Sequence, residues 1–388
     1  MKRILIILVL SIAATVIVTP ASAADQISYT SQPDEVAVFL NNVAFARDSI
    51  SLPGGVDVAV VLPSQIFQDT LVVRENGERV STYRINRSTG QIILRWQSST
   101  DSASREVTLE YLLSGVSWMP KYDMWLGNYP NDTDGDKELV DFTFFAEITN
   151  SVLSLDDVDV RLVAGRVDTS HQMDSVSTVT ANQYIAGYDR GGAGMMAEAA
   201  TVTGQVSIQH IYDVPNISAD MGDVVYIKLQ ESTLQARRVH LWNASTDNQI
   251  TVIYKVLNES ALPLAEGIVR SYQNGLFIGS DFVELTPIGG EGSVTIGSLQ
   301  EVRVSRSETR TAISSGTRWD TEHDIAMEMT NFGSEPVDIV IVDYYPEYSI
   351  EFSFSHEPEL QGNNLFRWEI TLDAGETLPM SYRYVAYN

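Results

Sequence analysis

The sequence predicts an all-β protein made of antiparallel β-sandwich domains, with one long flexible loop. Three observations predict this fold class. Apolar and polar residues alternate with a period of two along most of the chain, which is typical of strands that have one buried and one solvated face. Asn-Gly and Gly-Gly pairs separate several of these runs and supply the positive φ angles of tight hairpins. No segment shows the apolar period of a long amphipathic helix.

The alternating runs form an N-terminal and a C-terminal block. The N-terminal runs cover residues 36–40, 56–61, 70–73, 91–96 and 107–112, and the C-terminal runs cover residues 250–256, 268–273, 276–279, 337–342, 350–354, 366–370 and 381–385. Asn274-Gly275 joins two of the runs into the clearest hairpin of the sequence. Short strands at this spacing, rich in Val, Ile and Tyr, indicate sandwiches or barrels.

One segment, residues 168–205, breaks the alternation. It is rich in Ser, Thr, Gly, Ala and Met and has little β-branched or aromatic content to bury, so we expect a flexible loop. A long loop in a compact β protein is often functional. A variable insertion without a role is the alternative, and the sequence leaves both open.

The first residues predict export. Lys2 and Arg3 precede an uncharged apolar run at residues 4–18, and Ala21-Ser22-Ala23 follows. This is the arrangement of a secretory signal peptide, here residues 1–23, with cleavage after Ala23. An uncleaved membrane anchor is the alternative, although the run is short for a span. No later stretch approaches the length of a membrane span, so we expect a secreted or cell-surface protein without one after cleavage.

Composition narrows the classes of partner. The 388-residue chain has no Cys, so no disulfide stabilises it. It carries 51 acidic and 25 basic residues and a formal net charge of −26. Such a surface repels nucleic acid and anionic lipid, and we expect neither as a partner. The acid excess fits adaptation to a salty exterior, and an ordinary acidic secreted protein is the alternative.

Metal and catalytic motifs are weak. The five His residues are scattered and no Cys is present, which argues against structural zinc. The acidic stretch at residues 131–138 resembles a calcium-binding loop in composition. However, Pro130 occupies the position where an EF-hand loop needs its first ligand Asp. The weak calcium candidates there are Asp132, Asp134, Asp136 and Glu138.

No catalytic or cofactor-binding residue is predicted. The sequence has neither a G-x-S-x-G elbow nor a phosphate-binding glycine loop. A glycosidase needs only two carboxylates, and with so many acids the sequence leaves that chemistry open. Five N-x-S/T sequons predict glycosylation sites on exposed turns, at Asn86, Asn131, Asn216, Asn243 and Asn258.

Three groups of motifs resemble a known family. They are Ser114-Gly115-Val116-Ser117-Trp118-Met119-Pro120-Lys121-Tyr122-Asp123 with residues 145–150; residues 258–264 with Gly267, Asn274-Gly275, Gly279 and Gly290-Glu291; and Asn331 with Pro336-Val337, Tyr345-Pro346, Trp368 and Ala374-Gly375-Glu376. In order and spacing they resemble the domain of unknown function 4139 of mucoidy inhibitor A-like proteins, over about residues 104–387. Residues 35–77 resemble the small N-terminal β domain that usually precedes it. The long coiled coil that commonly joins the two is missing here, because no heptads follow residue 77.

The resemblance implies an envelope-associated β protein and transfers no catalytic residues. We therefore expect a signal peptide at 1–23, a small β domain at 24–103 and a family-like sandwich region at 104–388. The leading hypothesis is a secreted or cell-surface, non-enzymatic protein with a structural, scaffolding or binding role, its partner a cell-surface protein or polysaccharide. A glycan-active or glycan-binding protein and a calcium-stabilised extracellular module are the alternatives.

Overall fold

The computed structural model describes residues 26–53, 57–88, 90–97, 104–127, 137–167, 210–315 and 318–387. Within these ranges the chain is all-β, which confirms the predicted fold class, and its one helical element is the 3-10 turn η1 (Gln68–Thr70). The predicted signal segment and the predicted loop at 168–205 lie outside the described residues. No helix in the described part of the chain is long and apolar enough to cross a membrane.

Twenty-five strands follow one another along the described chain. The first nine are β1 (Gln26–Thr30), β2 (Glu35–Phe39), β3 (Val43–Pro53), β4 (Asp57–Leu62), β5 (Val72–Glu75), β6 (Glu78–Arg79), β7 (Arg84–Ser88), β8 (Gln91–Trp96) and β9 (Ser104–Ser114). The middle nine are β10 (Val116–Leu126), β11 (Lys137–Asn150), β12 (Leu155–Ala164), β13 (His210–Ala219), β14 (Val224–Asn243), β15 (Thr251–Leu257), β16 (Gly267–Gln273), β17 (Leu276–Val283) and β18 (Glu291–Ser298). The last seven are β19 (Val302–Ser315), β20 (Arg318–Asn331), β21 (Val337–Tyr344), β22 (Ser349–Phe354), β23 (Glu359–Gln361), β24 (Leu365–Leu372) and β25 (Thr377–Tyr387).

The strands form four successive modules of one connectivity. Each module has a leading strand and then four strands, of which the first pairs with the fourth and the second with the third, all antiparallel. Module 1 is β2 with β3, β4, β8 and β9; module 2 is β10 with β11, β12, β13 and β14. Module 3 uses β14 as its leading strand for β15 to β18, and module 4 is β19 with β20, β21, β24 and β25. The fold is therefore a tandem array.

Parallel pairings join each module to the one before it. The second strand of modules 2, 3 and 4 runs parallel to the leading strand of the preceding module, as β12 beside β2, β16 beside β10 and β21 beside β14. In module 1 the corresponding strand, β4, lies parallel to β1, which occupies the place of a preceding leading strand. These four pairs depart from the antiparallel expectation, because three of them connect strands of different modules and the fourth pairs β4 with β1, rather than joining the arms of a hairpin.

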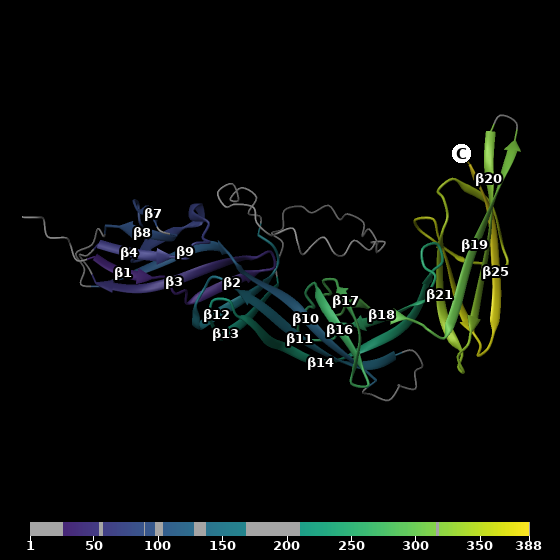
Figure 1. Cartoon of the computed structure of the whole chain (residues 1–388), viewed down its shortest axis with the longest axis horizontal. Helices are drawn as coiled ribbons and strands as arrows, with labels where there is room; N and C mark the ends of the chain where they lie inside the picture. The colour runs from purple at the N-terminus through teal and green to yellow at the C-terminus, as the bar shows by residue number, and fades with distance from the viewer. Residues whose placement is uncertain are drawn as a thin grey trace, which may run out of the picture.

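Two hydrophobic cores run along the array, which is elongated and curved (Figure 1). The larger core joins modules 1 to 3, and the smaller core fills module 4 together with the end of β14. Strand β9 begins the predicted second domain at residue 104, yet it pairs with β3 and β5 in the N-terminal sheet. The N-terminal sheet thus continues across the predicted boundary. This is because β3 and β9, the first and fourth strands of module 1, pair with each other although β4 and β8 lie between them in the chain.

Candidate functional site

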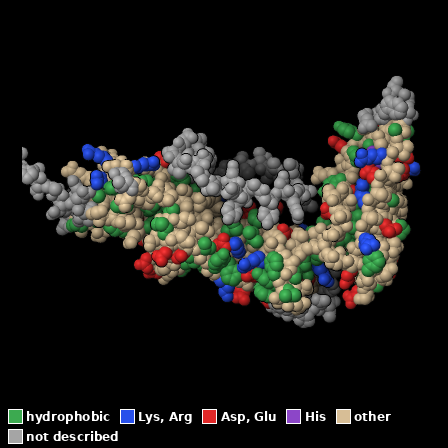
Figure 2. Space-filling model, in the orientation of Figure 1, with side chains coloured by type: hydrophobic (Ala, Val, Ile, Leu, Met, Phe, Trp, Pro, Cys, Tyr) green, Lys and Arg blue, Asp and Glu red, His purple; other side chains and the backbone are tan. Residues whose placement is uncertain are grey.

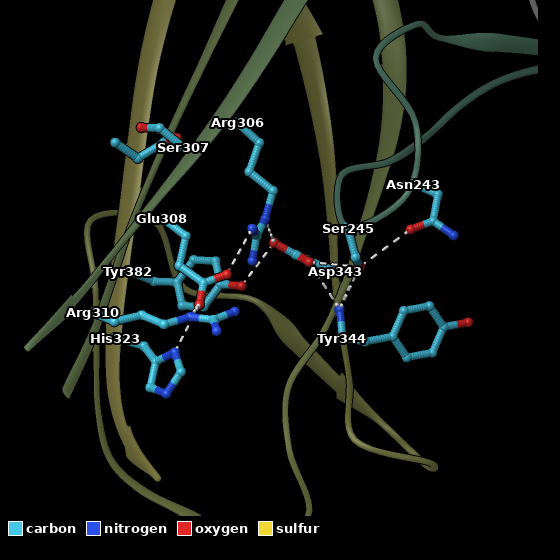
Figure 3. A network of polar contacts seen from close by, with 11 residues as sticks. Asn243, Ser245, Arg306, Ser307, Glu308, Arg310, His323, Asp343, Tyr344 and Tyr382 are labelled. Carbon is cyan, nitrogen blue, oxygen red and sulfur yellow. Dashed lines mark hydrogen bonds and ion pairs between the residues drawn. The ribbon is translucent and has the colours of Figure 1, made fainter. Parts of the chain in front are cut away.

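The most connected polar network lies in module 4 and centres on Asp343 of β21 (Figure 3). Its carboxylate is fully buried and accepts hydrogen bonds from Arg306 Nε at 2.8 Å and Tyr382 Oη at 2.7 Å. The other oxygen accepts from Ser245 Oγ at 2.8 Å and from the backbone N–H of Tyr344 at 3.0 Å. Both oxygens are therefore engaged by donors from three other segments of the chain.

Glu308 of β19 extends this network toward the surface. Its carboxylate accepts from Arg306 Nη1 at 3.2 Å and lies 2.8 Å from His323 Nδ1, and Arg310 donates to it as well. Burial raises the pKa of Glu308, but the hydrogen bonds from Arg310, His323 and Arg306 outweigh it and bring the pKa to about 2. The His323 ring stacks on Tyr384 with 4.6 Å between the ring centroids.

This network is suited to holding strands together. Burial and the neighbouring Asp343 carboxylate raise the pKa of Tyr382, while the hydrogen bond to Asp343 keeps Arg306 charged against the effect of burial. Glu308 stays ionised, whereas a general acid needs a carboxyl that holds its proton near neutral pH. The arrangement ties β19, β20, β21, β25 and the β14–β15 turn to one another, and we assign it a structural role.

A second buried carboxylate fixes the N-terminal strand. Asp48 of β3 is 1% exposed and accepts hydrogen bonds from Ser31 Oγ at 2.7 Å and from the backbone N–H of Gln32 at 2.9 Å. Tyr29 of β1 donates to the same group at 3.4 Å. Burial raises the pKa of Asp48, and the hydrogen bonds from Ser31 and Gln32 offset only part of that effect. These contacts hold β1 in its place beside β4.

An open cleft of about 1410 Å³ lies in module 1, between the edge strands β6 and β7 of its two sheets. Trp96 lies against it and donates from Nε1 to Glu75, which also pairs with the buried Arg105. Most other lining side chains are polar, and the lining residues are Val58, Glu75, Asn76, Glu78, Arg79, Val80, Ser81, Thr82, Tyr83, Arg84, Ile85, Asn86, Arg95, Trp96 and Gln97. The cleft is larger than a typical pocket for a drug-sized ligand.

Arginines give the cleft its charge. Arg84 of β7 stands directly opposite Arg95 of β8, and Arg79 of β6 stands opposite Arg74 of β5. Like charges directly opposite on neighbouring strands destabilise a sheet. Figure 2 shows the Lys and Arg side chains over the region of β7 and β8. Among the described residues no ion pair involves Arg79, Arg84 or Arg95, although Glu78 also lines the cleft.

Basic side chains elsewhere in this acidic protein commonly sit beside a carboxylate. Arg161 pairs with Glu35, and Arg383 pairs with Glu322 at 3.6 Å. The clustering of five Arg between residues 74 and 95 is visible in the sequence and could have drawn attention to this region. An arginine-lined cleft free of such pairing can bind anionic groups, because the guanidinium fork matches the geometry of carboxylate, sulfate and phosphate.

The predicted calcium residues are only partly described. Glu138 lies on β11, while Asp132, Asp134 and Asp136 lie outside the described residues. Among the residues that the structure does describe, no three His, Asp or Glu side chains are grouped to hold a metal ion.

The sequons differ in their surroundings. Asn86 is exposed at the cleft and Asn216 is exposed on β13, while Asn243 is half-buried at the end of β14. Asn131 lies outside the described residues.

The prediction of a glycan at Asn258 needs correction. This side chain is fully buried, and its amide nitrogen donates to the carbonyls of Leu262 and Thr286, both at 3.1 Å. A glycan on that nitrogen would break these bonds, so the fold leaves no room for one. Asn150 and Asn331 are also fully buried and close the equivalent corners of modules 2 and 4 in the same way.

Comparison with known proteins identifies the family. Residues 107–387 match the domain of unknown function DUF4139, which is more than half of the chain. The chain belongs to this family. The match includes modules 2 to 4 and most of β9, and every residue that lines the cleft of module 1 lies before it. No curated protein matches the chain.

Proposed function

We propose that this DUF4139 protein is exported and acts at the outer face of the cell by binding and scaffolding, without catalysing a reaction. The signal-like residues 1–23 support the location. The module 4 network supports the non-catalytic role, because hydrogen bonds from Arg310, His323 and Arg306 hold the pKa of Glu308 at about 2, and the buried Asp343 carboxylate is engaged by Arg306 and Tyr382. A tandem array of sandwiches supports scaffolding, since it places binding surfaces far apart on one chain.

One observation carries the binding role, namely the cleft with Arg79, Arg84 and Arg95. Guanidinium groups on facing strands, with no ion pair to a carboxylate among the described residues, favour an anionic ligand. The hydroxyl and amide side chains between them favour a ligand rich in hydroxyl groups over an apolar peptide or lipid. A strongly acidic chain also disfavours the dense phosphate charge of nucleic acid. The proposed ligand is an acidic polysaccharide whose sugar rings carry carboxylates.

The test is binding of polygalacturonate to the full chain by calorimetry, with neutral dextran and dextran sulfate as comparison polymers. Arg84→Ala with Arg95→Ala should weaken polygalacturonate binding at least about tenfold, since each lost charge-assisted hydrogen bond contributes about 1.5–3 kcal/mol. Arg161→Ala with Arg383→Ala removes the same charge from exposed sites outside the cleft and should leave affinity nearly unchanged. Salt should weaken the native interaction.

Three outcomes would contradict the proposal. Equal losses in the two double variants would assign the effect to net charge rather than to the cleft. Stronger binding of dextran sulfate would name sulfate in place of carboxylate, and depolymerisation of any polymer would show an enzyme. Cell fractionation tests the location separately, because removal of residues 1–23 should retain the protein in the cytoplasm.

A further inference from the structure

The leading strand of module 4 has an open edge. In the order β19-β20-β25-β22 of its sheet, β19 is the first strand, and among the described residues it pairs only with β20. It is 14 residues long. Along its outer edge alternate residues present unpaired N–H and C=O groups, and such an edge is a template for another strand. Native proteins usually shorten or cover edges of this length.

Every other leading strand is covered in one specific way. Strands β2, β10 and β14 each carry the second strand of the next module in parallel. The register locates the corresponding segment of β19, because Val116 of β10 faces Asn150 and Val302 of β19 faces the equivalent Asn331. Residues 121–126 of β10 bind β16, so the matching segment of β19 is residues 307–312. In the described part of the chain, the edge of β19 is therefore the one leading-strand edge without a parallel partner, whereas the corresponding edges of β2, β10 and β14 are each paired with the second strand of the next module.

The other end of the array has the complementary strand. In module 1 the second strand, β4, pairs in parallel with the five-residue β1 instead of with a preceding module. Strand β1 thus covers an edge that in modules 2 to 4 joins a neighbour. Figure 1 places β1 and β4 at the end of the molecule opposite to β19.

We infer that β19 of one copy accepts β4 of a second copy, in parallel and at residues 307–312, after β1 of the second copy has been displaced. The contact continues the interface by which successive modules of this chain already join. Because it uses opposite ends of the molecule, it is a head-to-tail contact and extends into an open row of copies. The parallel pairing of β19 with β4 replaces the parallel pairing of β1 with β4, so the number of paired strands stays the same. The ease of this exchange depends on how strongly the hydrogen bonds to Asp48 hold the segment of β1 in place.

Charge sets the conditions for this assembly. Two copies with a formal net charge of −26 each repel one another, and the range of that repulsion falls with ionic strength. The row should therefore form in concentrated salt. The inference does not depend on the ligand of the cleft, and the binding test and the assembly test can fail separately.

Sedimentation of the full chain at about 0.1 M and about 1 M NaCl, where the Debye length is about 10 Å and about 3 Å, tests the assembly. We expect monomers in low salt and concentration-dependent oligomers in high salt. Deletion of residues 26–30 should strengthen association at least about tenfold, because β4 is then uncovered. If both the full chain and the variant without residues 26–30 stay monomeric at both salt concentrations, the inference is overturned. The charged residues of β19 would then be read as protecting its edge from pairing.

Cysteine cross-linking tests the site, and it suits a chain that has no Cys. Thr309→Cys protein mixed with Val61→Cys protein should give a mixed disulfide dimer in high salt. The matched control is Ser381→Cys, an exposed position on β25, which lies between two other strands. We expect the Thr309 mixture to yield at least about ten times more mixed dimer than the Ser381 mixture. Equal yields would refute docking at β19 even if the deletion variant failed to fold.

Discussion

Replacing the buried Asp343 tests the structural role of the module 4 network. Asp343→Asn keeps the volume of the side chain but removes the charge that Arg306 and Tyr382 face. Breaking one partner out of a buried ion pair costs about 3–5 kcal/mol. Arg306 keeps a second carboxylate, Glu308, at 3.2 Å, and Ser245 can rotate its hydroxyl. We therefore expect the lower end, a loss of about 3 kcal/mol in the free energy of unfolding.

Urea unfolding followed by tryptophan fluorescence measures this loss, because Trp242 and Trp368 are buried in the same core. Glu359→Gln is the control, since that carboxylate is 64% exposed and its ion pair should contribute less than about 1 kcal/mol. Adding Arg306→Met to Asp343→Asn should cost less than the sum of the single changes, because no buried charge is then left unpaired. A loss for Asp343→Asn no larger than for the control would refute the assignment of this network as the main polar tie of module 4.

The other predictions concern the acid stability that Glu308 contributes, the buried side chain of Asn258 and the close backbone contact between Gly267 and Pro120. Because the pKa of Glu308 falls from 4.5 to about 2 on folding, its contribution is complete above about pH 4.5 and disappears as the pH falls to about 2; Glu308→Gln should flatten the stability profile in that window, and unchanged acid unfolding would contradict this. Asn258→Ala removes the bonds that its amide donates to the carbonyls of Leu262 and Thr286 and the acceptor of the backbone N–H of buried Ser260, and it should cost about 2–4 kcal/mol in thermal or urea unfolding, whereas the exposed Asn86→Ala should cost almost nothing. Gly267→Ala would place a Cβ 2.4 Å from the carbonyl oxygen of Pro120 and should separate β16 from β10, so amide exchange in β16 should accelerate at least about tenfold; protection equal to that of the native chain would show that the backbone adjusts.

The tandem modules explain several features that single motifs do not. Buried Asn150 and Asn331 are the last residues of β11 and β20, and buried Asn258 directly follows β15. Each donates to a backbone carbonyl at the end of the third strand of its module or between the third and fourth strands. One Asn side chain thus holds both the turn that follows it and the segment that leads into the fourth strand of the same module. This is why a buried polar residue is stable there, since its donors and acceptor are all satisfied.

The internal repeat could not be predicted from the sequence, because the buried Asn residues that mark equivalent positions in the modules are unequally spaced along the chain. Segments of very different length separate Asn150, Asn258 and Asn331, and a fixed period is the usual sign of tandem repeats. The residues that follow each corner also differ, since Val152 follows Asn150 at the position where Ser260 follows Asn258 and Gly333 follows Asn331. Only the similar hydrogen bonds of the three Asn side chains in the structure relate the corners to one another.

The sequence by itself determined the all-β class and the local hairpins, because the period-two alternation and pairs such as Asn274-Gly275 depend on neighbouring residues alone. That hairpin appears as β16 and β17, with positive φ at both turn residues. The sequence also resembled the family to which the chain belongs. Export and the polysaccharide ligand stay predictions.

Only the tertiary structure decided the order of the modules, the burial of Asn258, the facing arginines of the cleft and the open edge of β19. All of these depend on contacts between segments far apart in the chain, such as β21 beside β14. Alternation specifies which face of a strand is buried, whereas the backbone groups at its two edges are alike in every sequence. The choice of neighbouring strand is therefore made by the packing of whole modules.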